Sequence, residues 1–142
     1  MNGVTGRMGS NQHLMRSIMA IREDGGIPLK NGGTVMPEPV LVGRNSSKLR
    51  ALSKKTGIDA WTTDLDKALA DDDNEIYFDA LLTELRPPRV RKAINAGKHI
   101  YSEKPSALTT ETAVDLYERA EEHGVKHGVV QDKLWLPGLQ KL

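Results

Sequence analysis

Residues 96–105 read Ala-Gly-Lys-His-Ile-Tyr-Ser-Glu-Lys-Pro, a stretch that leads from a glycine through a short run into a charged turn. Gly97 suits the end of a helix, because glycine readily adopts the left-handed conformation that closes one. Residues 98–102 are predicted to form a strand. Glu103, Lys104 and Pro105 follow directly, so the sequence places two charged side chains at the carboxyl end of a strand.

The same alternation of helix and strand continues outward in both directions. A strand is predicted over 75–80 and a helix from Pro87 to Ala96, with the proline in the first turn, where a backbone N–H has no helical partner. Downstream, a helix from Thr109 to His123 precedes a strand over 125–130. Upstream, the predicted elements are a helix over 10–22, a polar loop over 23–39, a strand over 39–42, a helix over 46–56, a strand over 59–61 and a short helix over 64–70. This pattern predicts an α/β fold with a doubly wound, mostly parallel sheet of the Rossmann type.

Capping residues mark the ends of the predicted helices. Asn45, Asp64 and Thr109 are predicted N-caps, because their side-chain oxygens accept hydrogen bonds from the free N–H groups of a first turn. Gly57 and Gly124 are predicted stops, where a left-handed residue closes the helix. These capping residues predict where three helices begin, on evidence that is independent of the spacing of their apolar residues.

A glycine-rich segment opens the chain immediately before its first predicted helix. Gly3, Gly6 and Gly9 are spaced three apart, with Arg7 and Met8 between the last two. Glycines at such positions permit a tight turn and let backbone N–H groups approach a pyrophosphate at the start of a helix. We therefore expect all five residues to bind a dinucleotide. The alternative is a glycine-rich loop at a chain end without a ligand.

The end of the strand over 39–42 bears on which dinucleotide is bound. An acidic residue here would hydrogen-bond an adenosine ribose, but this chain has Gly43, followed by Arg44 and Asn45. A guanidinium suits a 2′-phosphate, or it can stack on adenine. Arg44 and Asn45 are thus expected to bind the cofactor, with NADP slightly favoured over NAD. An ordinary solvated arginine is the alternative.

Residues 96–105 closely resemble a hallmark of the Gfo/Idh/MocA family of oxidoreductases, Ala-Gly-Lys-His-Val-x-x-Glu-Lys-Pro in its nucleotide domain. Residues 61–69, 121–129 and 136–139 also look like segments of that domain, so the resemblance covers nearly the whole chain. It implies hydride transfer between NAD(P) and a sugar-like or polyol substrate. Three departures are visible: Leu81-Leu82 replaces a more usual Thr-Pro, Arg86 stands where histidine is common, and Leu134-Trp135 replaces an Arg-Phe pair.

The resemblance also implies roles for individual residues. Lys104 would be catalytic, lying near the nicotinamide and the substrate hydroxyl, and Glu103 would help to position it. Pro105 would follow a cis peptide bond. Further residues implied near the cofactor are Thr83, Leu85 and Arg86 after one strand and Gln131, Asp132 and Lys133 after another.

Measured against that family, the single predicted nucleotide-binding domain over 1–142 is incomplete at both ends. Its central first strand should precede Gly3, where only Met1 and Asn2 stand, so this strand is expected to be largely missing. Each buried backbone group left unpaired there would cost about 1–3 kcal/mol. The family's C-terminal α+β domain, which carries most of the substrate site, is expected to be absent. Whether this chain is an active enzyme by itself therefore stays open.

Composition argues against several other classes of function. The formal net charge is +1, which calls for neither nucleic acid nor an anionic membrane as a partner. The chain has no cysteine, which excludes disulfides and thiolate metal sites and fits a cytoplasmic protein. Its histidines show no metal-like spacing, so we expect no metal site. No apolar run approaches the length needed to span a membrane. The expected partner is a small-molecule substrate.

Two other functions remain open at this point. The chain could be a non-catalytic dinucleotide-binding or interaction module that forms a homo-oligomer or pairs through exposed sheet edges. A reductase of the dihydrodipicolinate type is a weaker alternative, suggested by residues 3–9. The Glu103-Lys104-Pro105 turn argues against it.

Overall fold

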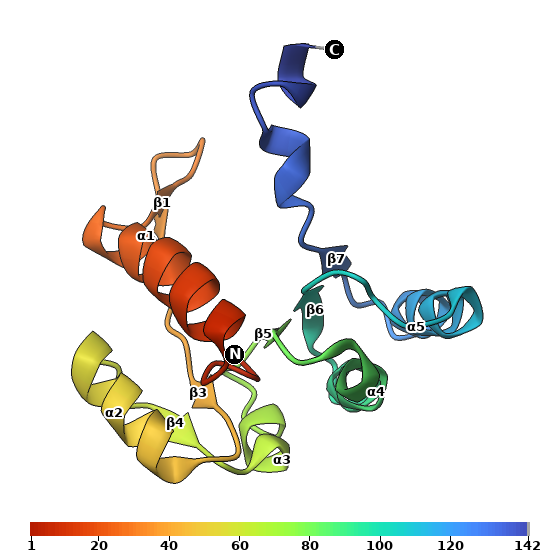
Figure 1. Ribbon diagram of the computed structural model, residues 1–142, viewed down its shortest axis with the longest axis horizontal. Coiled ribbons are helices and arrows are strands. Elements are labelled where there is room, and N and C mark those ends of the chain that lie inside the picture. Colours follow the sequence, from red (N-terminus) through yellow and green to blue (C-terminus); the bar gives the residue numbers. More distant parts are fainter. Residues whose placement is uncertain (142) are drawn as a thin grey trace. The chain divides into compact units, whose positions relative to one another are not determined.

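A computed structural model describes residues 1–141, with the exception of the Asp132 side chain. The chain divides into two compact units, Met1–Asp73 and Asn74–Leu142. Each unit combines parallel strands with helices, and this confirms the predicted α/β, Rossmann-like fold (Figure 1).

The sheet of the first unit is built on two parallel strands, β3 (Leu41–Val42) and β4 (Trp61–Thr62). The first residues of the chain extend this ladder, because Asn2 forms a parallel bridge with Val42. The Val42 N–H donates to the Met1 carbonyl at 2.9 Å, and the Gly3 N–H donates to the Val42 carbonyl at 3.2 Å. The first strand is thus reduced to a single bridge, in agreement with the expectation that it is largely missing, and this bridge pairs one edge of β3.

The opening helix is longer and more loosely wound than the sequence suggested. We predicted an ordinary helix over 10–22, whereas the structure has a π-helix, η1 (Met8–Met19), that continues as α1 (Ala20–Glu23). A π-helix bonds each N–H to the carbonyl five residues back, so apolar spacing alone does not reveal it. Leu14 on this helix is fully buried and packs in a core with Val4, Leu41, Leu49 and Ile58.

The remaining helices of this unit begin at the predicted caps. Asn45 Oδ1 accepts from the Lys48 N–H at 2.9 Å at the start of α2 (Ser46–Thr56). Asp64 Oδ1 accepts from the Lys67 N–H at 3.1 Å at the start of α3 (Leu65–Leu69). Gly57, with φ of 72°, closes α2 as predicted.

The segment over 23–39, predicted as a polar loop, contains a small antiparallel hairpin. Its strands are β1 (Ile27–Pro28) and β2 (Thr34–Val35). The Leu29 N–H donates to the Gly33 carbonyl at 2.7 Å, and Gly32 turns the chain with φ of 86°. The prediction failed because the glycines and prolines that indicate a loop also make a tight hairpin turn.

The second unit holds three parallel strands in the order β5 (Ile76–Asp79), β6 (His99–Ser102) and β7 (His127–Val129). A 3₁₀ turn, η2 (Thr83–Leu85), leads into α4 (Arg86–Asn95), and α5 (Thr110–Glu122) follows β6. These helices lie side by side (Figure 1). Two 3₁₀ turns, η3 (Asp132–Trp135) and η4 (Leu139–Lys141), follow β7. The predicted strands and helices of this half are confirmed, with ends that shift by a few residues.

The helices of the second unit bury the faces that their apolar spacing indicates. Val90, Ala93 and Ile94 of α4 are fully buried, at the three- and four-residue spacing of one helix face. Leu116 and Ala120 of α5 are fully buried as well. Among the described residues, every helix is too short or too polar to cross a membrane.

His127, the first residue of β7, is expected to make the stability of the fold depend on pH. Burial lowers the pKa of its imidazole from 6.5, and Nε2 is buried without a hydrogen-bond partner among the described residues. The folded chain thus binds this proton less readily than the unfolded chain. The free energy of unfolding should therefore decrease as the pH falls below about 6.5.

The matched variant is His127→Gln, which cannot titrate. Urea unfolding between pH 7.5 and pH 5 should show a smaller loss of stability for this variant than for the parent chain. An equally steep loss in both proteins would show that His127 does not contribute to the pH dependence.

Candidate functional site

The opening glycines of the first unit form a turn that leaves no room for a side chain. A Cβ built on Gly9 would lie 2.4 Å from the Gly3 carbonyl oxygen, a distance that real Cβ atoms essentially never show. The Gly6 N–H donates to that same carbonyl at 3.0 Å, and Gly3 itself has φ of 82°. Gly6, Arg7 and Met8 are exposed at the start of η1. The turn therefore offers backbone N–H groups at a helix start, as an anion requires.

The end of β3 packs closely against this turn. A Cβ on Gly43 would lie 3.2 Å from Thr5 Cγ2 and 3.3 Å from Thr5 Oγ1, so a side chain fits only if Thr5 moves. Arg44 is exposed directly after it. The acceptor oxygen of Asn45 is occupied as the N-cap of α2, which leaves its amide nitrogen to donate to a ligand.

In the second unit, the Glu103-Lys104-Pro105 turn follows β6 as predicted. The Lys104–Pro105 peptide bond is cis. Glu103 is 8% exposed, and its Oε2 accepts from the Lys104 N–H at 3.0 Å. The Glu103 N–H donates to the Asp79 carbonyl at 2.9 Å and so ties the turn to the end of β5.

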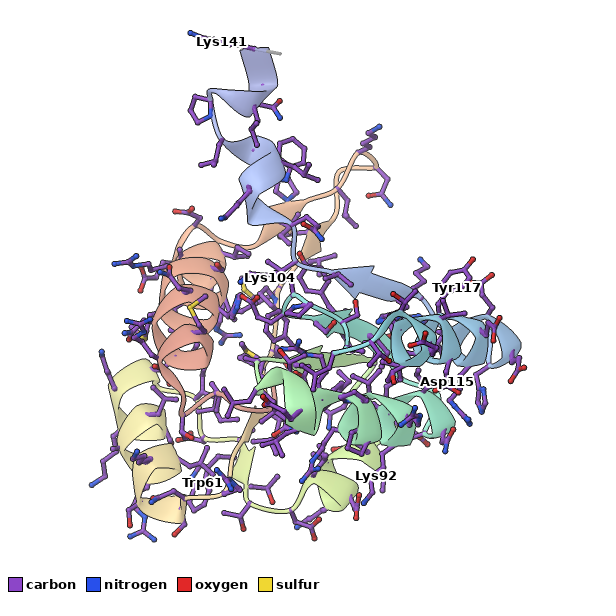
Figure 2. All side chains as sticks on the ribbon, turned by 45° about the vertical axis from the view of Figure 1, so that its right-hand side comes forward. Trp61, Lys92, Lys104, Asp115, Tyr117 and Lys141 are labelled. Carbon is purple, nitrogen blue, oxygen red and sulfur yellow. The ribbon has the colours of Figure 1, made fainter. Side chains whose placement is uncertain are left out.

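Lys104 follows the buried Glu103 and is itself exposed at the surface. Figure 2 shows it after β6, whereas the labelled residues Lys92, Asp115 and Tyr117 lie on α4 and α5. No other described residue binds its ammonium group in a hydrogen bond or ion pair. An exposed cation on a fixed backbone is available to a ligand.

Arg86, predicted to contact the cofactor, is held inside the second unit. Its side chain is 1% exposed, and Nε donates to Asp79 Oδ1 at 2.9 Å. Nη2 donates to the Leu81 carbonyl at 2.7 Å, and Nη1 donates to the Pro105 carbonyl. These bonds leave it no open face toward a ligand, and they join the ends of β5 and β6.

Asp79 is a site residue that the sequence did not indicate. It is fully buried, and its Oδ2 accepts from the Tyr77 hydroxyl at 2.8 Å. Its Oδ1 accepts from the Leu81 N–H at 3.0 Å as well as from Arg86. The available signal was an acid at the end of a buried strand, seven residues before the unexpected arginine.

The other predicted residues of this unit follow the same ends of parallel strands. Thr83 lies after β5 in η2 and is half-buried, as is Leu85. Gln131 is exposed after β7, and the side chain of Asp132 lies outside the described part of the structure. Since β5, β6 and β7 are parallel, Thr83, Lys104 and Gln131 all follow carboxyl ends at one edge of the sheet.

Residues 5–131, which include the parallel strands and the Glu-Lys-Pro turn, match one family model, the oxidoreductase family with an NAD-binding Rossmann fold. The chain belongs to this Gfo/Idh/MocA family. It is 52% identical over 142 residues to a D-xylose dehydrogenase of Paenarthrobacter nicotinovorans. That match covers 100% of this chain and 37% of the relative, so the chain spans little more than a third of it.

Solved structures of this family share its fold. The WlbA dehydrogenase of Bordetella pertussis, in complex with NADH and UDP-GlcNAcA, is 25% identical with a TM-score of 0.77, over 98% of this chain and 36% of that one. A levoglucosan dehydrogenase in complex with NADH and levoglucosan is also 25% identical, with a TM-score of 0.73 over 90% of this chain and 33% of that one. The chain thus matches about a third of the length of each of these structures.

The burial of Arg86 predicts a large loss of stability when it is removed. Arg86→Met leaves the Asp79 carboxylate buried without its cation, which should lower the free energy of unfolding by about 3–5 kcal/mol. Arg91→Met, on the same helix, is the matched control. Arg91 pairs with Asp115 at 2.8 Å where both side chains are over a third exposed, so its loss should cost about 0.2–1 kcal/mol. Urea unfolding followed by circular dichroism measures both, and equal losses would contradict the structural role of the buried pair.

Proposed function

We propose that this chain is the nucleotide-binding part of an NAD(P)-dependent dehydrogenase that acts on a sugar or polyol. The observation that carries the proposal is the exposed, uncommitted ammonium of Lys104 at the carboxyl edge of parallel strands, in a chain of an NAD-binding family. The 52% identity to a D-xylose dehydrogenase supports the substrate class.

The residues at the opening turn fit the diphosphate of such a cofactor. The close approach of Gly9 to the Gly3 carbonyl keeps this turn tight. The start of η1, where N–H groups lack helical partners, attracts negative charge. We propose that Gly3, Gly6, Arg7, Met8 and Gly9 bind the diphosphate. Their fit rests on backbone geometry, so it does not depend on a particular side chain.

At the reacting end, a bound nicotinamide supplies the acceptor for a hydride from the substrate carbon. We propose that the Lys104 ammonium donates a hydrogen bond to the substrate hydroxyl oxygen and stabilises the negative charge that develops there, as the hydroxyl proton passes to water and the carbonyl forms. Glu103, through its bond to the Lys104 N–H, holds the backbone from which that ammonium extends. Thr83, Gln131 and Asp132 are proposed to contact the cofactor from the same edge.

The first test is the affinity of the chain for NADH and NADPH, measured by calorimetry. Gly9→Ala should weaken binding about tenfold or more, because its Cβ forces the turn to open. Gly138→Ala is the control, since a Cβ there meets nothing within 4 Å. A parent chain that binds neither cofactor, or a Gly9→Ala variant that binds as well as the parent, would contradict the proposal.

The preference between the two cofactors is proposed to lie with Arg44, in favour of NADP. An exposed guanidinium after Gly43 can bind a 2′-phosphate, and no carboxylate stands at position 43 to repel one. Arg44→Ala should raise the Kd for NADPH about tenfold through loss of a charged hydrogen bond, with the Kd for NADH changed less than about twofold. Arg50→Ala, an exposed arginine on α2, should change neither. Equal effects of Arg44→Ala on both cofactors would leave no role for it in selecting the 2′-phosphate.

A further inference from the structure

We propose that Arg86 is a positioning residue for Lys104, which it reaches through the carbonyl of Pro105. This inference rests on the proposed function, because the direction of the Lys104 side chain affects binding only if that side chain lies beside the nicotinamide. Arg86 itself has no exposed face and is not expected to touch the cofactor.

The guanidinium joins three points of the backbone and side-chain framework. Nε is fixed by Asp79 at the end of β5, and Nη2 by the Leu81 carbonyl in the next turn. The third bond, from Nη1, goes to the Pro105 carbonyl, the residue directly after Lys104. Because the guanidinium is planar and its N–H groups point in fixed directions, it holds the Pro105 carbonyl in a fixed position relative to Asp79 and the Leu81 carbonyl.

The other side of Lys104 is held from the same strand end. Its own N–H donates to the Glu103 carboxylate, and the Glu103 N–H donates to the Asp79 carbonyl. The residues on both sides of Lys104 are thus anchored to Asp79, directly on one side and through Arg86 on the other. The ammonium at the surface takes its direction from this buried frame.

Lysine cannot replace arginine in this arrangement. An ammonium keeps the charge beside Asp79, but it is a single centre and cannot hold the three acceptors in the directions of a guanidinium fork. Arg86→Lys therefore preserves the buried ion pair and releases the Pro105 carbonyl. Arg91→Lys, at the exposed pair with Asp115 on the same helix, is the matched control.

The test compares the affinity for NAD(P)H with that for the matching ADP-ribose, which lacks the nicotinamide. Arg86→Lys should weaken NAD(P)H binding about fivefold and leave ADP-ribose within about twofold, whereas Arg91→Lys changes neither. In a Lys104→Met background the effect of Arg86→Lys should vanish. The inference would be overturned if Arg86→Lys still weakened NAD(P)H binding in the Lys104→Met background, or if it weakened ADP-ribose binding equally. Either result would mean that Arg86 acts on the structure generally and not on Lys104.

A measurement without cofactor separates this inference from the proposed function. The amide signals of Glu103, Lys104 and Ser106 should shift in Arg86→Lys and stay in place in Arg91→Lys. If Lys104→Met does not alter the preference for NAD(P)H over ADP-ribose, the proposed role of Lys104 fails, and these signals alone decide whether Arg86 positions the turn. Unshifted signals would overturn the inference. Should Arg86→Lys not fold, the neutral pair Asp79→Asn/Arg86→Gln is used with the same readouts.

Discussion

A buried guanidinium needs acceptors for its donors, and Arg86 finds them on three segments of the second unit. Asp79, itself fully buried, receives bonds from Tyr77, the Leu81 N–H and Arg86, so its carboxylate is well paired. Removal of either partner would leave a charge in an environment that does not solvate it. The turn that carries Lys104 is attached to this pair and depends on its integrity.

The candidate residues of the two units are held in place by different means. The first unit relies on the absence of side chains, since the close approach of Gly9 to Gly3 is possible only for glycine. The second unit relies on a buried polar network that fixes an exposed cation. One strategy suits a diphosphate, which backbone N–H groups can bind, and the other suits a reacting centre, where the direction of one side chain matters.

Much of this arrangement was predictable because the relevant signals are local. Asn45, Asp64 and Thr109 cap their helices as predicted, and Gly57, Gly97 and Gly124 follow helices with positive φ. The cis bond before Pro105 was implied by the family resemblance, whereas the order of the parallel strands and their helices was predicted from the residues themselves. Such features depend on a few neighbouring residues, whose chemistry the sequence displays directly.

Some features that were not predicted depend on contacts between residues far apart in the sequence. Others depend on glycines and prolines, which are found both in loops and in tight hairpin turns. The hydrogen bonds of Arg86 to Asp79 and to the Pro105 carbonyl are contacts that the sequence does not display. The hairpin over 27–35 and the π-helical start of the chain are likewise invisible to apolar spacing. The pairing of Met1 and Gly3 with β3 shows that two or three residues can satisfy an edge that appeared to need a whole strand.

The close packing of Gly43 against Thr5 has a consequence for redesign of the cofactor preference. Introducing an acidic side chain after β3, the simplest route toward a ribose hydroxyl, would push against the glycine turn itself. A designer would have to let Thr5 move or replace it with a smaller residue in the same step, because its methyl and hydroxyl lie 3.2 Å and 3.3 Å from the new Cβ. In this chain, the proposed contact with the adenosine end and the shape of the proposed diphosphate loop are therefore one engineering problem rather than two.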